Sequence, residues 1–230
     1  MKQKLCALLL ILWATHSLAG DFEAGFHEAE NGNYKKALPL LKNSAKEGNP
    51  MAHVVLGLMY KNGKGLKQDL KEAVHSFEQA AQMGDSDGQY NLGNMYDNGL
   101  GVKQDHKEAV KWYELAANQG VVDAQLRLGL MYQFGQGVKQ NYTHSEKWYR
   151  MAAEQGDADA QLMLGLANWL GRGVKQDRLR GYMWTNLAAA NGSHEALKEQ
   201  EGMEKKVSQK EIQQALDLGR KCTDSQYKDC

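Results

Sequence analysis

The chain has 230 residues, with 28 basic and 28 acidic side chains and a mean hydropathy of −0.63. Such a neutral balance does not favour binding to nucleic acid or to an acidic membrane surface. There are only two prolines and no low-complexity linker, so we expect one continuous folded body.

The N-terminus has the pattern of a secretory signal peptide. Lys2 and Lys4 flank the start of an apolar run from Leu5 to Ala14, and Ser17-Leu18-Ala19 has the small-x-small form of a cleavage site. We predict a signal peptide over residues 1–19 and therefore a periplasmic or secreted protein. The run is about half the length needed to cross a bilayer, and no later run is longer, so no integral membrane span is expected.

Removal of this leader would leave two cysteines, Cys222 and Cys230. An even number of cysteines in an exported chain predicts a disulfide, which would close the tail over residues 222–230. The alternative is a pair of free thiols.

Four 14-residue segments recur at a spacing of 36 residues, which predicts a repeat array. They read LGLMYKNGKGLKQD from Leu56, LGNMYDNGLGVKQD from Leu92, LGLMYQFGQGVKQN from Leu128 and LGLANWLGRGVKQD from Leu164. Each contains two glycines around a variable residue. A phosphate-binding loop needs its contacts once, whereas four copies with a variable middle residue indicate a turn.

The turn explains how each repeat can be a pair of helices. Glycine can adopt a positive φ where a helix ends, so we predict helix termination at Gly63, Gly99, Gly135 and Gly171. The next helix is predicted to begin after an N-cap at Asp69, Asp105, Asn141 or Asp177, with Glu72 and Glu108 completing capping boxes. A second set of glycines, Gly48, Gly84, Gly120, Gly156 and Gly192, ends the second helix. Val121 is the one poor N-cap that follows this set.

The motif A-x-x-x-L-G-x-x-Y-x-x-G-x-G-V, an aspartate, and then A-x-x-W-x-x-x-A-A resembles the Sel1-like repeat family, relatives of the tetratricopeptide repeats. The resemblance covers residues 52–192. It implies an all-α, right-handed α-solenoid of stacked helix-turn-helix repeats with a C-terminal helical cap. We expect a partial repeat over 20–49, repeats over 50–84, 85–120, 121–156 and 157–193, and capping helices over 194–221.

Departures from the motif gather late in the array. They are Ser145, Asn168, Gly181 and Thr185, and we expect them to loosen the packing of the fourth repeat. We predict no catalytic, cofactor or metal site, because the histidines occupy unrelated repeat positions and no cysteine or serine nucleophile motif is present.

Function is therefore expected on the surface of the solenoid. By analogy with tetratricopeptide grooves, the candidate partner-binding residues are Tyr90, Asn94, Asp97, Asn98, Leu126, Leu130, Phe134, Leu162, Leu166, Trp169 and Leu170. Two interpretations stay open for the apolar members, packing against the next repeat or binding a partner. Phe134, Trp169 and Leu170 stand where earlier copies are mostly polar, which favours a binding patch.

Three functions fit this sequence. The first is an exported, non-enzymatic scaffold that binds a protein or peptide and uses no cofactor, which the resemblance links to envelope processes or host contact. The second is a periplasmic inhibitor or immunity protein that occludes a toxin or hydrolase. The third, least favoured, is an enzyme acting on cell-wall or β-lactam material.

Overall fold

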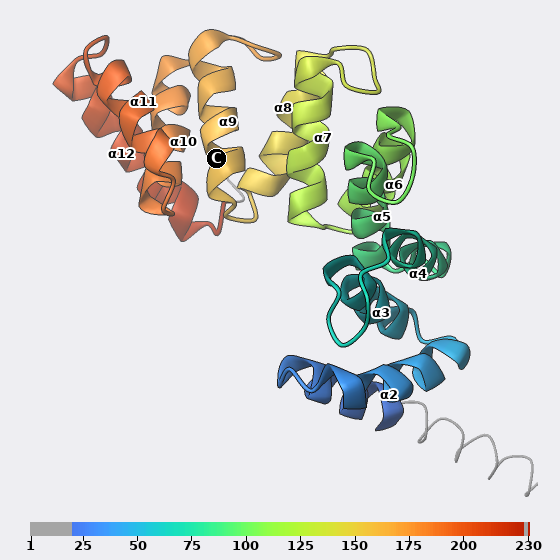
Figure 1. The fold of residues 1–230 in the computed structure, drawn as a ribbon. Helices are drawn as coiled ribbons and strands as arrows, with labels where there is room; N and C mark the ends of the chain where they lie inside the picture. Colours follow the sequence, from blue (N-terminus) through green and yellow to red (C-terminus); the bar gives the residue numbers. More distant parts are fainter. Residues whose placement is uncertain (1–19, 228–229) are drawn as a thin grey trace, which may run out of the picture. The chain divides into compact units, whose positions relative to one another are not determined.

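The computed structural model describes residues 20–227 and residue 230 (Figure 1). The predicted signal peptide, residues 1–19, lies outside the described residues. Every regular element in the described part is an α-helix. The chain divides into two compact units, the first ending at Ala116 and the second beginning at Ala117, within helix α6.

The first unit begins with a helix over residues 20–30. It continues with α2 (Tyr34–Lys46), α3 (Pro50–Asn62), α4 (Leu70–Gln82), α5 (Ser86–Asn98) and α6 (His106–Asn118). The second unit contains α7 (Val122–Phe134), α8 (Tyr142–Ala153), α9 (Ala158–Leu170), α10 (Arg178–Ala190), α11 (His194–Glu204) and α12 (Gln209–Asp224). Helices α2 to α5 pack consecutively in the first unit, and α7 to α11 do so in the second, where α12 packs against α10.

The predicted turn chemistry is confirmed. Gly63, Gly99, Gly135 and Gly171 end their helices in the left-handed conformation, with φ between 66° and 72°. The next helices begin at side-chain caps: Asp69, for example, accepts hydrogen bonds from the Lys71 and Glu72 amides. Val121 provides no such bond, as predicted. The capping boxes expected at Glu72 and Glu108 are wrong, because the amides of Asp69 and Asp105 donate to the Tyr60 and Tyr96 carbonyls instead, each at 3.0 Å. The Glu108 carboxylate pairs with Lys111.

In the first three repeats, a glycine of the first helix receives an aromatic ring from the second helix. A Cβ on Gly93 would lie 2.8 Å from the Tyr113 ring, and Gly57 and Gly129 meet Phe77 and Tyr149 in the same way. These three rings are at most 1% exposed. The absent side chain therefore lets the ring lie directly on the helix backbone, which closes the hairpin.

The fourth repeat is packed more closely than the sequence suggests, so the prediction of loosened packing is wrong. Thr185 and Gly181 take the places of an aromatic residue and an alanine. A Cβ on Gly181 would lie 2.8 Å from the Trp169 backbone nitrogen, and the Thr185 hydroxyl donates to the Gly181 carbonyl at 2.9 Å. The smaller residues let the backbones of α9 and α10 approach each other.

Buried glutamines connect successive hairpins in the second unit. The Gln125 amide donates to the Ala117 carbonyl at 3.0 Å, and Gln161 donates to Ala153 at 3.2 Å. Their oxygens accept from Gln155 and Asn191, which lie at the end of the second helix of the same repeat, each at 2.8 Å. Each glutamine thus adds a side-chain donor to a carbonyl at the end of the previous helix, which also accepts the amide of Gly120 or Gly156 at 3.0 Å.

The C-terminal helices cover the end of the array. Ser208 and Glu211 form a reciprocal capping box at the start of α12. Cys222 and Cys230 are joined by a disulfide with a Cα–Cα distance of 5.0 Å. Within the described residues, no helix combines the length and the apolar character needed to cross a bilayer.

The glycine and ring contact predicts opposite effects for two helical glycines. Gly129→Ala should destabilise the protein by about 1 to 3 kcal/mol, because a methyl group would overlap the Tyr149 ring. Gly202→Ala should stabilise it by up to about 1 kcal/mol, because that glycine has no neighbour within 4 Å and alanine favours helix. Urea unfolding followed by circular dichroism measures both. Equal shifts in the two variants would contradict this packing.

Candidate partner-binding site

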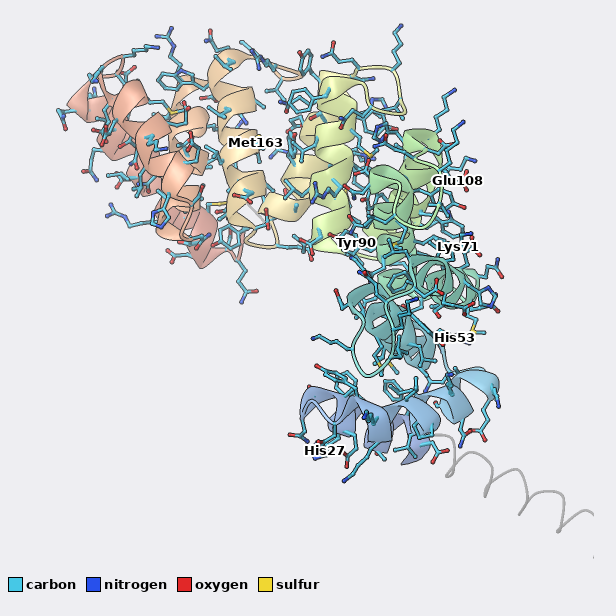
Figure 2. The ribbon with its side chains drawn as sticks, in the orientation of Figure 1. His27, His53, Lys71, Tyr90, Glu108 and Met163 are labelled. Carbon is cyan, nitrogen blue, oxygen red and sulfur yellow. A yellow bond between two sulfur atoms is a disulfide. The ribbon has the colours of Figure 1, made fainter. Side chains whose placement is uncertain are left out.

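A pocket opens in the second unit between α7, α8 and α9. It has a volume of about 60 Å³. Its apolar wall comes from α9, where Met163, Leu166 and Leu170 lie about one helical turn apart and so share a face. Figure 2 shows the side chains of these helices and labels Met163 on α9. Leu170 is 50% exposed at the rim.

The wall from α8 is fixed to α7 by two hydrogen bonds. The Ser145 hydroxyl donates to the Gly129 carbonyl at 2.7 Å, and the Tyr149 hydroxyl donates to the Gln133 side chain at 2.8 Å. Burial raises the pKa of Tyr149 well above its usual value of 10.0. The phenol therefore stays protonated at physiological pH and serves as a fixed donor.

Arg172 and Tyr142 also line the pocket. Arg172 is the middle residue of the glycine pair that follows α9, and its guanidinium lies 6.0 Å from the centre of the Tyr142 ring. The first unit has the equivalent pair, with Lys64 5.4 Å from the Tyr34 ring. The middle residue of the turn therefore reaches the first residue of the second helix in the preceding repeat.

The turn after α9 is basic. Residues 172–180 contain four cations and one carboxylate, whereas residues 100–108 contain two of each. Arg150, Lys175 and Arg180 line an open cleft of about 380 Å³ there. Arg150 is paired with Glu146, which lines the pocket, through bonds of 2.9 and 2.6 Å. Pocket and cleft are thus linked by this ion pair.

The opposite end of the same hairpins is acidic. Asp157 caps α9 by accepting from the Ala160 amide at 2.7 Å. Burial, and then the charges of Asp159 and Asp123, raise the pKa of Asp157 above its usual 3.8. Charge in the second unit is thus separated along the helix axes.

The predicted residues of the first unit contact their own hairpin. The Tyr90 ring lies 5.8 Å from the Tyr113 ring, and Asn94 accepts a hydrogen bond from the Tyr113 hydroxyl at 3.1 Å. Asp97 is 2.8 Å from the His106 ring nitrogen. The exposed Asn98 donates to the Asn94 carbonyl. Tyr90, Asn94, Asp97 and Asn98 thus make contacts within their own hairpin.

The predicted residues of the second unit fall into two groups. Leu162 and Trp169 are 2% and 8% exposed, so the expectation that Trp169 forms a surface patch is wrong. Trp169 packs inward because Gly181 leaves room beside its backbone. Leu126 and Leu130 pack partly buried on the same core. Only Leu166 and Leu170 line the pocket, while Phe134 is 63% exposed at the end of α7.

Several lining residues were not predicted, namely Tyr142, Ser145, Met163 and Arg172. Ser145 was noted only as a departure from alanine. Arg172 and Tyr142 lie at positions that vary among the repeats, and such variation on a shared scaffold is the signal that could have identified them. Among residues 20–227 and 230, no group of three or more His, Cys, Asp or Glu is arranged to hold a metal ion.

The family model described as Sel1 repeat matches residues 50–85, 86–121, 122–157 and 158–193. The chain belongs to the Sel1-repeat family. No curated protein matches it in sequence.

Solved structures with Sel1 repeats have the same fold. A protective antigen present in uropathogenic Escherichia coli strains, with an SLR fold, is 33% identical at a TM-score of 0.80, and the match covers 90% of this chain and 46% of the antigen. This chain therefore spans about half of the antigen. A Sel1 repeat protein from Oxalobacter formigenes is 32% identical at 0.75, over 78% of this chain and 74% of that one. The predicted fold class, an all-α solenoid of stacked helical hairpins, is confirmed.

The buried position of Trp169 predicts that this residue stabilises the fourth Sel1 repeat. Trp169→Ala should lower the free energy of unfolding by about 3 to 5 kcal/mol, because it leaves a cavity beside α10. Phe134→Ala should change it by less than about 0.5 kcal/mol, because the ring is mostly in solvent. Thermal and urea unfolding of both variants provide the comparison. A Trp169→Ala protein as stable as the parent would contradict the buried position.

The acidic end predicts a pH-dependent effect of Asp157→Asn. A carboxyl whose pKa is raised on folding contributes stability below its unfolded pKa and loses it as the pH rises through the folded pKa. Asparagine keeps the cap without the charge, so the variant should gain stability relative to the parent between about pH 4 and pH 7. Asp177→Asn, at a cap beside Lys175 and Arg178, should lose stability at pH 7. Unfolding midpoints of both variants and the parent, measured from pH 3 to pH 7, test this prediction. A difference between Asp157→Asn and the parent that does not change with pH would contradict the raised pKa of Asp157.

Proposed function

We propose that this chain is an exported, non-enzymatic Sel1-repeat scaffold that binds a protein or peptide partner through the pocket between α7, α8 and α9. The observation that carries the proposal is an apolar pocket with an exposed leucine at its rim. Leu170 exposes half of its surface, although the residues at this position in the first two repeats are Asn62 and Asn98. An aliphatic residue exposed beside a pocket is typical of a contact site.

The frame of the pocket also supports binding by shape. The hydrogen bonds of Ser145 and Tyr149 hold α8 against α7, and the Glu146–Arg150 ion pair fixes one turn of α8. A wall that is already ordered loses little conformational freedom when a partner binds. The polar groups named in this wall already have hydrogen-bond partners, which fits recognition better than chemistry on a substrate.

A location in the envelope or outside the cell is part of the proposal. The bond between Cys222 and Cys230 supports it, because disulfides persist in oxidising compartments. One similar structure is a protective antigen, which agrees with an exported chain and with the host contact suggested by the family resemblance.

The experiment is crosslinked capture from an envelope fraction of the source cells, with mass spectrometry. Leu170→Ser should reduce recovery of the captured partner about tenfold, because a buried leucine contact is worth about 1 to 2 kcal/mol. Leu197→Ser is the matched control, since Leu197 is 49% exposed on α11, outside the pocket. It should leave capture unchanged. Equal capture by the parent, Leu170→Ser and Leu197→Ser proteins would overturn the proposal.

A further inference from the structure

The basic charge beside the pocket is not neutralised by the fold. Within the described residues, Arg172, Lys175 and Arg180 form no ion pair with a carboxylate. The one carboxylate of the turn, Asp177, accepts the Arg180 amide as an N-cap at 2.9 Å. The Glu146 charge is already matched by Arg150. The surface beside the pocket therefore presents a net positive charge to solvent.

The basic side chains follow the pocket residues closely in the sequence, and one ion pair joins the pocket to the cleft that they line. Arg172 lines the pocket, and Lys175 and Arg180, three and eight residues later, line the cleft. The Glu146–Arg150 pair has one member in each lining. A ligand that enters the pocket beside Arg172 would thus find further cations within one short extended segment.

We propose that the occupant of this site is an acidic peptide segment that inserts one aliphatic side chain into the pocket and places carboxylates against Lys175 and Arg180. This inference rests on the proposed function and specifies its partner. The apolar wall of Met163, Leu166 and Leu170 receives the side chain. The basic turn attracts the flanking carboxylates and fixes the direction of the segment.

The size and lining of the pocket favour a peptide over other polyanions. A volume of about 60 Å³ corresponds to roughly two liquid waters, which admits the end of an aliphatic side chain and excludes a nucleobase. The Tyr142 ring of this lining already has the Arg172 guanidinium 6.0 Å from its centre. A nucleic-acid phosphate backbone would interact only with the basic side chains and would leave the apolar wall of the pocket exposed to water.

The test uses the purified full chain and fluorescein-labelled peptides of glutamate, glycine and serine with one central leucine. Fluorescence anisotropy should show binding that weakens as salt is added. Replacing the leucine by serine, or the glutamates by glutamine, should each weaken binding about tenfold. The double variant Lys175→Glu/Arg180→Glu should do the same. The control Lys205→Glu/Lys206→Glu has the same change of charge outside the site and should bind as the parent does.

Three outcomes would overturn the inference. The first is that the serine peptide or a single-stranded oligonucleotide binds as tightly as the leucine peptide, which would indicate a general polyanion surface. The second is that the Lys175→Glu/Arg180→Glu variant binds the leucine peptide as the parent does. The third is that the parent self-associates with rising concentration in sedimentation velocity and this variant does not, which would make a second copy of the chain the occupant. If envelope capture depends on Leu170 while no acidic peptide binds, only the partner chemistry is wrong. If capture is also independent of Leu170, the proposed function fails with it.

Discussion

The close approach of two helices at a residue without a side chain is the contact on which the rest of this structure depends. At Gly57, Gly93 and Gly129 the opposing ring lies on bare helix backbone, so no other residue fits. The two helices of each hairpin are then held at a fixed distance from each other. The turn that joins them must therefore begin at a fixed residue of the first helix. The turn glycines continue the same constraint, since Gly101 and Gly173 lie against the backbone of the preceding repeat at Leu70 and Tyr142. The stacking of the repeats therefore depends on the absence of side chains at these glycines as much as on the burial of apolar side chains.

This constraint leaves one position of each turn free to vary and fixes where its side chain goes. The residue between the two glycines meets the first residue of the preceding second helix. Lys64 lies over the Tyr34 ring, Arg172 lies over the Tyr142 ring, and Leu100 packs on the same cluster as Leu70. A cation faces an aromatic ring in two cases, and an aliphatic residue packs in the same cluster as another in the third. The array thus keeps one scaffold and changes its surface chemistry turn by turn.

The fold was predictable from the sequence because four copies agree, and the site was not because it lies where they differ. Helix ends, N-caps and the glycine pairs follow from recurrence at 36 residues. Trp169 was assigned to the surface because the residues at its position in the other repeats are polar. The space that it occupies exists because Gly181, on the next helix, replaces the alanine of the repeat motif. The large residue at 169 and the small residue at 181 compensate for each other, and a comparison of the repeats one position at a time does not reveal this. Arg172 was missed because variation was taken as lack of constraint.

The separation of charge in the second unit bears on which partner can use the pocket. Its own acidic end is built from Asp157, which is occupied as the N-cap of α9, and Asp159, which lies in the helical first turn. Such carboxylates cannot carry an aliphatic neighbour into a pocket of about 60 Å³ without unwinding that turn. An extended segment has no such restriction, because its side chains alternate and its backbone is free to follow the turn. The charge attracts both kinds of acidic surface, and the apolar pocket distinguishes between them.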